Sequence, residues 1–117
     1  MKEIISTVEV VTDARHPSVT HKVLFKGFVS QYDCETQTET IQMTSYKVID
    51  DAEGEYEYLR EHSRTVDKAT IDAIVAGLTI TSTDYTDIRN EQIAKGIQYV
   101  INDGSIFGLT TAQTTIR

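Results

Sequence analysis

Few residues of this chain have the types and spacing that chemistry needs. Cys34 is the single cysteine, so a thiol nucleophile has only His62 or His21 as a possible base. No catalytic signature surrounds the cysteine, and the simpler interpretation is a loop thiol beside surface histidines. We therefore predict that the protein is not an enzyme.

The acidic turn at residues 50–55 offers clustered carboxylates of the kind that calcium prefers. If Gly54 took the sixth position of an EF-hand loop, Ile49 would be first and Arg60 twelfth, where the loop needs an acid and a glutamate. The three histidines have no metal-ligand spacing, and the glycines lie where turns or helix ends explain them. The sequence therefore predicts no metal site and no cofactor.

Other residues indicate contacts between proteins. Tyr56 and Tyr58 lie in a strand-like segment with acidic neighbours, and tyrosine is enriched at interfaces because it combines apolar area with a polar tip. The alternative is that both are ordinary half-buried sheet residues. Arg89 falls within the apolar stripe of a predicted helix, and we favour its pairing with an acid from another element or chain over a role in ligand binding.

The segment that positions most of these residues is 83–104, which we predict to be the longest helix. Its core-facing stripe spans half of the helical wheel. Thr83 is the predicted N-cap and Gly104 the predicted stop. Ile88 and Tyr99 form a thinner second stripe, which predicts a helix covered on two faces, the second by another subunit. The members of the core-facing stripe are Tyr85, Ile93, Ala94, Ile97, Val100 and Ile101.

A shorter helix precedes it. From Val66 the apolar period changes from two to 3.6, with Thr65 as the expected N-cap and Gly77 as the stop. Residues 60–64 are charged and are predicted to be a connector. Residues 105–109, with Phe107 at their centre, are predicted to form an apolar edge strand. We expect residues 110–117 to be ordered only by a neighbouring molecule.

Alternating apolar residues predict strands in the first half of the chain. The predicted strands are 4–11, 19–32, 38–49 and a short 55–59. The second and third of these suit an antiparallel hairpin, and Gly27 marks a bulge or a close backbone approach. The fold class is therefore α+β, with an antiparallel sheet of three to five strands packed by two C-terminal helices. We expect a single domain over 1–117, strand-rich in 1–60, helical in 65–104, and ending in a short strand and tail at 105–117.

Composition excludes several classes of partner. Acidic residues outnumber basic ones 18 to 11, and the net charge of −7 opposes attraction to nucleic acid or to anionic membranes. No segment approaches the ~18 consecutive apolar residues of a membrane span, and no secretion signal is visible. A lone cysteine cannot form an internal disulfide, which favours a cytoplasmic protein.

The overall layout resembles small virion proteins of tailed bacteriophages. The likeness covers the strand-rich first half, then VDKATIDAIVAGL and QIAKGIQYVINDGSIFGLT, mainly residues 66–110. It rests on layout without an invariant motif, so no functional residue carries over. The resemblance implies a non-enzymatic building block of the neck, connector or tail, repeated in a ring and bound to copies of itself and to larger virion proteins. Its location would then be the virion.

Three hypotheses follow. The leading one is a structural or assembly protein that acts through protein contacts. The alternative is a small bacterial enzyme or ligand-binding module, with a cleft between sheet and helices lined by His21, His62, Tyr56 and Tyr58. The third is an acidic mimic of nucleic acid, which requires the carboxylates to gather on one face. The interface candidates under the leading hypothesis are Ile88, Tyr99, Tyr56, Tyr58, Phe107 and Arg89.

Overall fold

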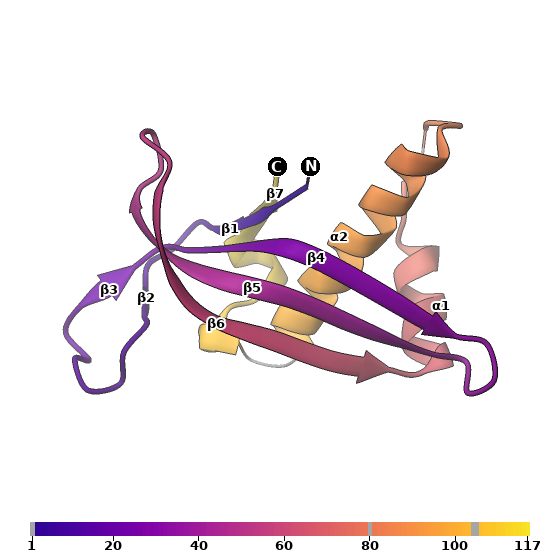
Figure 1. Cartoon of the computed structure of the whole chain (residues 1–117), viewed down its shortest axis with the longest axis horizontal. Helices are drawn as coiled ribbons and strands as arrows, with labels where there is room; N and C mark the ends of the chain where they lie inside the picture. Colours follow the sequence, from indigo (N-terminus) through magenta and orange to yellow (C-terminus); the bar gives the residue numbers. More distant parts are fainter. Residues whose placement is uncertain (1, 80, 104–105) are drawn as a thin grey trace.

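The computed structural model describes residues 2–79, 81–103 and 106–117 and has an α+β fold, as the sequence predicts. Five antiparallel strands form the main sheet in the order β6-β5-β4-β1-β7, and two short strands form a second sheet, β2-β3 (Figure 1). The strands are β1 Ile4–Ser6, β2 Val10–Val11, β3 Thr20–His21, β4 Val23–Asp33, β5 Thr38–Asp50, β6 Glu55–Val66 and β7 Thr114–Ile116. The helices are α1 Lys68–Ala76, α2 Tyr85–Asp103 and the short 3-10 turns η1 Ile106–Gly108 and η2 Thr111–Gln113.

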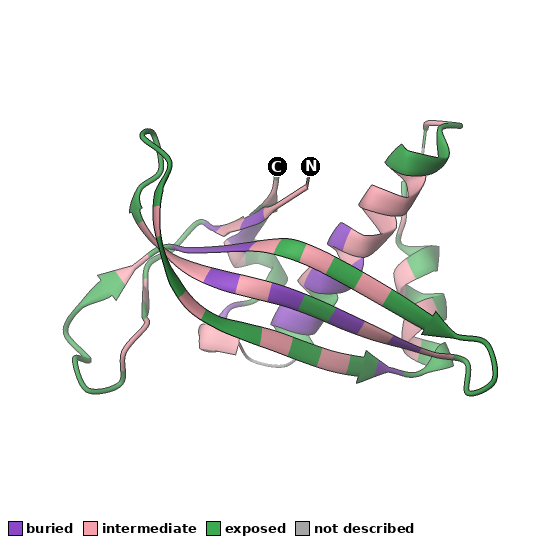
Figure 2. Cartoon of the chain, in the orientation of Figure 1, coloured by how far each residue is buried: buried purple, intermediate pink, exposed green. Residues whose placement is uncertain are grey.

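The core lies between α2 and one face of the main sheet (Figure 2). Alternate strand residues such as Phe25, Ile41 and Met43 point to α2, which buries Ala94, Ile97, Val100 and Ile101 against them. Burial of each large side chain contributes about 1.5–3 kcal/mol. Four members of the predicted core stripe are therefore buried, and Ile93 packs at the edge of the core. Tyr85 is 76% exposed because it occupies the first turn of α2, and its predicted place in the core is wrong.

Aspartates, not threonines, begin both helices. The side chain of Asp84 accepts a hydrogen bond from the N–H three residues on, and Asp67 does the same for α1. The predicted caps Thr83 and Thr65 are therefore wrong. Thr65 lies inside β6, and a carboxylate additionally interacts favourably with the positive end of the helix dipole.

Glycines end one helix and bend one strand. Gly77 closes α1 as predicted, with its N–H bonded to carbonyls of the last turn. Gly104 lies outside the described residues. The register between β4 and β5 shifts between Lys26 and Val29, and Gly27 there has φ of +70°, so the predicted bulge in this hairpin is confirmed.

The first predicted strand, 4–11, is divided. Ser6 is buried, accepts a hydrogen bond from the N–H of Val23 and donates one to the carbonyl of Val8. These bonds turn the chain out of the main sheet, so β1 ends at Ser6 and β2 joins the second sheet. The predicted strand 19–32 is also divided, into β3 of the second sheet and β4 of the main sheet.

Three further predictions are wrong: the connector at 60–64, the strand at 105–109 and the tail at 110–117 ordered only by a neighbouring molecule. Residues 60–64 are part of β6, where the strand pairs with β5 along its length. Residues 106–108 form η1 instead of a strand, because Phe107 and Gly108 both have positive φ, which extended backbone cannot adopt. Ser105 lies outside the described residues. The edge position belongs to β7, whose pairing with β1 orders the tail within its own chain.

Candidate functional site

Part of the main sheet extends as a ribbon of three strands, β4, β5 and β6. β1 pairs only with Leu24 and Phe25, so in the described residues β4 from Lys26 to Asp33 has a strand partner on one side alone. β6 is an edge strand and pairs only with β5. Such edges carry unpaired backbone N–H and C=O groups and can accept another strand.

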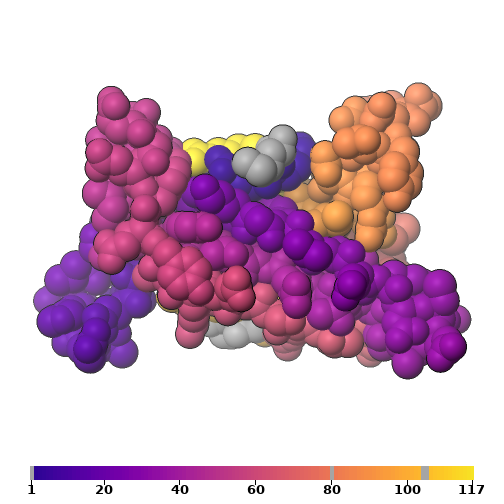
Figure 3. Space-filling view, viewed as in Figure 1, coloured from indigo at the N-terminus to yellow at the C-terminus, as the bar shows by residue number. Residues whose placement is uncertain are grey.

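One face of this ribbon is open to solvent. α1 and α2 contact the other face, and the side away from them is the outer face (Figures 1 and 3). Val29 is 52% exposed there, and beside it lies a shallow hollow of about 210 Å³ lined in part by Gly27 and Gln42. The registers place in this outer face Lys26, Val29, Gln31, Asp33, Thr38, Thr40, Gln42, Thr44, Glu61, Ser63 and Thr65.

The arrangement nearest to a catalytic pair is His62 with Ser45. The Nε2 atom of His62 lies 2.8 Å from Oγ of Ser45, and that hydroxyl donates to the carbonyl of Arg60 at 3.2 Å. Which atom donates in the contact between His62 and Ser45 depends on the ring tautomer, so the contact by itself assigns His62 no general-base role. Ser45 is also fully buried. Burial, with repulsion from Arg60 in second place, lowers the pKa of His62, so the ring is neutral at pH 7.

The thiol pairings considered from the sequence are not formed. Cys34 is exposed in the connection between β4 and β5, before Thr38. His62 lies opposite Met43, which is five residues along β5 from Thr38, or about 16 Å of strand. His21 lies in β3 in the second sheet, away from the connection (Figure 1).

The predicted cleft does not match five hollows in the described part of the chain. His62 lines two of these hollows, and His21, Tyr56 and Tyr58 line none of the five. Within residues 2–79, 81–103 and 106–117, no three His, Cys, Asp or Glu side chains gather as metal ligands. Nδ1 of His21 is buried with no hydrogen-bond partner among the residues that the structure describes.

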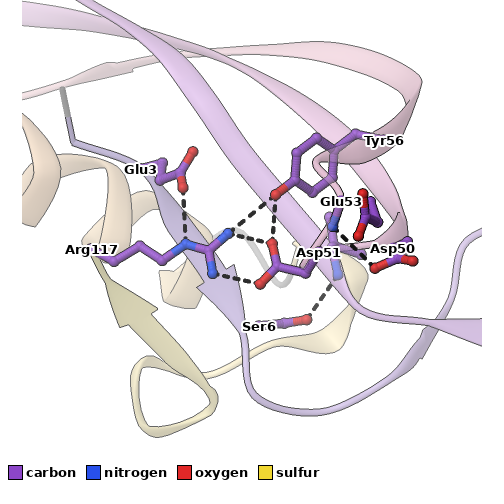
Figure 4. Close-up of polar contacts among 8 residues, drawn as sticks. Glu3, Ser6, Asp50, Asp51, Glu53, Tyr56 and Arg117 are labelled. Atoms are coloured by element: carbon purple, nitrogen blue, oxygen red, sulfur yellow. Dashed lines mark hydrogen bonds and ion pairs between the residues drawn. The ribbon is translucent and has the colours of Figure 1, made fainter.

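A polar cluster joins β7 to the β5–β6 hairpin (Figure 4). The guanidinium of Arg117 donates to both carboxylate oxygens of Asp51 at 2.7 and 2.6 Å, and its Nε donates to Glu3 at 2.9 Å. The hydroxyl of Tyr56 donates to Asp51 at 2.5 Å. Arg117 and then Tyr56 hold the pKa of Asp51 well below its usual range, while Asp51 raises the pKa of Tyr56. We call these four side chains the hairpin clamp.

The interface candidates fall in different places. Tyr56 belongs to the hairpin clamp, and Tyr58 is 59% exposed beside Tyr46. Phe107 packs against the core and contacts the rings of Phe25 and His62. The ring of Phe107 therefore offers less surface to a partner than it would in the predicted apolar edge strand.

On α2, Ile88 is half-buried and Tyr99 is 37% exposed. Arg89 lies 3.3 Å from the buried carboxylate of Glu39 in β5, so its predicted pairing with an acid of another element is confirmed. Glu39 also accepts a hydrogen bond from Ser30. Both partners of Glu39 belong to the same chain.

Neither the outer face nor the hairpin clamp was predicted from the sequence. The first had a visible signal, since Thr40, Gln42 and Thr44 alternate with the buried Ile41 and Met43 along one strand. The clamp had none, because Asp51 and Arg117 are separated by most of the chain and only the folded sheet brings them together.

The geometry defines a small α+β protein whose described residues form an open sheet surface. Comparisons with protein-family models, with curated proteins and with solved structures found no match to this chain. Among the described helices, none combines the length and the apolar character that crossing a bilayer requires.

Proposed function

We propose that this protein is a non-enzymatic assembly protein that acts by binding other protein chains. The observation that carries the proposal is the β4–β5–β6 ribbon, whose outer face is open and whose β6 edge has no strand beside it in the described residues. A sheet covered on one side by helices buries only half of its side chains, and the other half remains available to a partner.

Exposed apolar side chains support the same function. Val29 lies on the ribbon, Tyr58 beside the hairpin, and Val75 on α1, each about half exposed. The elongated shape, 44 × 28 × 22 Å, adds surface relative to volume and leaves more of it for neighbours.

The particular form that we propose is a repeated component of a tailed-phage virion, in the neck, connector or tail. Its support is the layout of a strand-rich half followed by two helices, together with a sheet that has two edges available for neighbouring subunits. Head-to-tail contacts between different surfaces of identical subunits close into rings when the rotation between them permits it.

The test is the mass of the full chain in solution and its ability to capture partners. Size-exclusion chromatography with light scattering over a wide concentration range should give a mass above that of one chain. For the virion form, the chain added to a lysate of phage-infected cells should be recovered with particles on a density gradient. A strict monomer at high concentration that captures no protein would contradict the function.

A further inference from the structure

We infer that the outer face of the β4–β5–β6 ribbon binds the same face of a second copy of this chain. The inference rests on the proposed assembly function, because it names a partner and a surface, and its two-fold contact is separate from the head-to-tail contacts that would close a ring. Two identical proteins of charge −7 repel one another, so they can meet only where the surface carries little net charge. Over the rows from Lys26 to Gln31 the outer face holds one cation, Lys26, and one anion, Glu61, while Asp33 adds a second anion at the far end of β4.

Lys26 and Glu61 lie at opposite ends of one cross-strand row. The registers pair Lys26 with Thr44 and Thr44 with Glu61, so Thr44 of the central strand separates them. Strands are about 4.8 Å apart, which places the two backbones about 10 Å from each other. Neither residue forms an ion pair with any residue that the structure describes.

Consider two copies whose outer faces meet, related by a two-fold axis that runs parallel to β5 between the two sheets. This axis makes the charges of the row in one copy complementary to those in the other. The rotation places β4 of one copy over β6 of the other. Lys26 of each copy then faces Glu61 of the other, which gives two ion pairs. Aligned sheets pack about 10 Å apart, a distance that a lysine and a glutamate can span from opposite sides.

The next row fits the same operation. Val29 pairs with Gln42 and Gln42 with Ser63, so the rotation sets the exposed Val29 of each copy over the small Ser63 of the other. The hollow of about 210 Å³ between these side chains gives the valine room. Gln42 meets Gln42 of the second copy, and each amide can both donate and accept a hydrogen bond.

Lys26 is already held on this side of the sheet. Its ammonium lies 4.8 Å from the ring centre of Tyr46 and 5.5 Å from that of Tyr56. These cation–π contacts keep the charge above the sheet, where it can meet a facing carboxylate. Tyr46 also marks the border of the contact, since the register between β5 and β6 shifts between Ser45 and Tyr46.

Charge reversal tests the inference on the full chain. Sedimentation equilibrium should give a dimer for the natural sequence. Lys26→Glu and Glu61→Lys each turn both ion pairs into repulsive contacts and should weaken dimerisation by roughly tenfold or more. The double variant exchanges the charges and should restore dimerisation to within about threefold of the natural chain, since it rebuilds both pairs.

Matched controls separate the contact from net charge and folding. Glu53→Lys changes the net charge as Glu61→Lys does, but it lies in the exposed hairpin turn and should leave dimerisation unchanged. Circular dichroism of each variant confirms the fold. If the natural chain assembles and both single reversals assemble equally well, the outer face is not the contact, although the assembly function stands. If the natural chain is a monomer that captures no partner, both proposals are wrong.

Discussion

Arg117 and Asp51 form a bidentate ion pair, with hydrogen bonds of 2.7 and 2.6 Å, that joins β7 to the hairpin between β5 and β6. Arg117 directly follows β7, which is one edge strand of the sheet, and Asp51 lies in the turn that leads into β6, the other edge strand. The hairpin therefore curls back across the sheet, and the pair fixes where it stops. The side chain of Arg117 is 35% exposed and that of Asp51 is 39% exposed, so solvent screens the ion pair.

Loss of this pair should loosen the hairpin without unfolding the protein. For Asp51→Asn we expect amide hydrogen exchange in residues 50–56 to accelerate a few-fold, because exposed ion pairs stabilise weakly. Exchange in α2 should not change. Asp50→Asn, in the same turn but without contact to Arg117, is the matched control. Equal exchange in Asp51→Asn and the natural chain would mean that the hairpin holds its position without the clamp.

His62 should make stability depend on pH. The fold lowers the pKa of His62 and so favours the neutral ring. The stability that this neutral ring contributes is fully present above the pKa of the unfolded chain, about 6.5. It is lost as the pH falls below that value. Urea unfolding at pH 7.5 and 5.5 should show a smaller loss of stability for His62→Gln than for the natural chain. His16→Gln, on the exposed turn, is the control. Identical losses in His62→Gln and the natural chain would contradict the assignment.

Gly27→Ala should destabilise the β4 bulge by about 1–2 kcal/mol, since φ of +70° is costly for a residue with a β-carbon. The nearest atom to that carbon is Oγ1 of Thr44 at 3.7 Å, so the cost comes from the backbone and not from a clash. Gly27→Asn should cost less, because asparagine tolerates this conformation. Chemical denaturation measures both, and equal stability of all three chains would exclude a strained bulge.

Arg89 neutralises a buried carboxylate, so Arg89→Met should cost about 1–2 kcal/mol by leaving the charge of Glu39 without this cation. Adding Glu39→Gln should recover part of this loss, because the unpaired charge disappears. Lys68→Met, which breaks an exposed pair on α1, should leave stability nearly unchanged. A double variant no more stable than Arg89→Met would show that the arginine acts through its packing alone.

The flank of α2 that carries Ile88 and Tyr99 offers a competing contact surface. If the outer face forms the dimer, Tyr99→Asp should dimerise as the natural chain does. Because the side chain of Tyr99 is 37% exposed, an aspartate there should leave the fold intact. Light scattering of Tyr99→Asp beside Glu61→Lys distinguishes the two surfaces. Dissociation of the first variant but not the second would favour the helix.

The sequence by itself determined the fold class, the α2 core stripe from Ala94 to Ile101, the β4–β5 hairpin and the bulge at Gly27. These features depend on local periodicity and backbone preference, which neighbouring residues carry. The prediction of a connector at 60–64 was wrong, because an exposed edge strand can carry charged side chains and still pair along one side.

Only the tertiary structure decided which surfaces remain open. The pairing of β7 with β1, the meeting of Asp51 with Arg117 and the row from Lys26 to Glu61 each join segments far apart in the chain. Strand order and register set these contacts, and they follow from how the whole sheet packs on α2. No local pattern encodes that packing, so the placement of charge on the outer face became visible only in the folded chain.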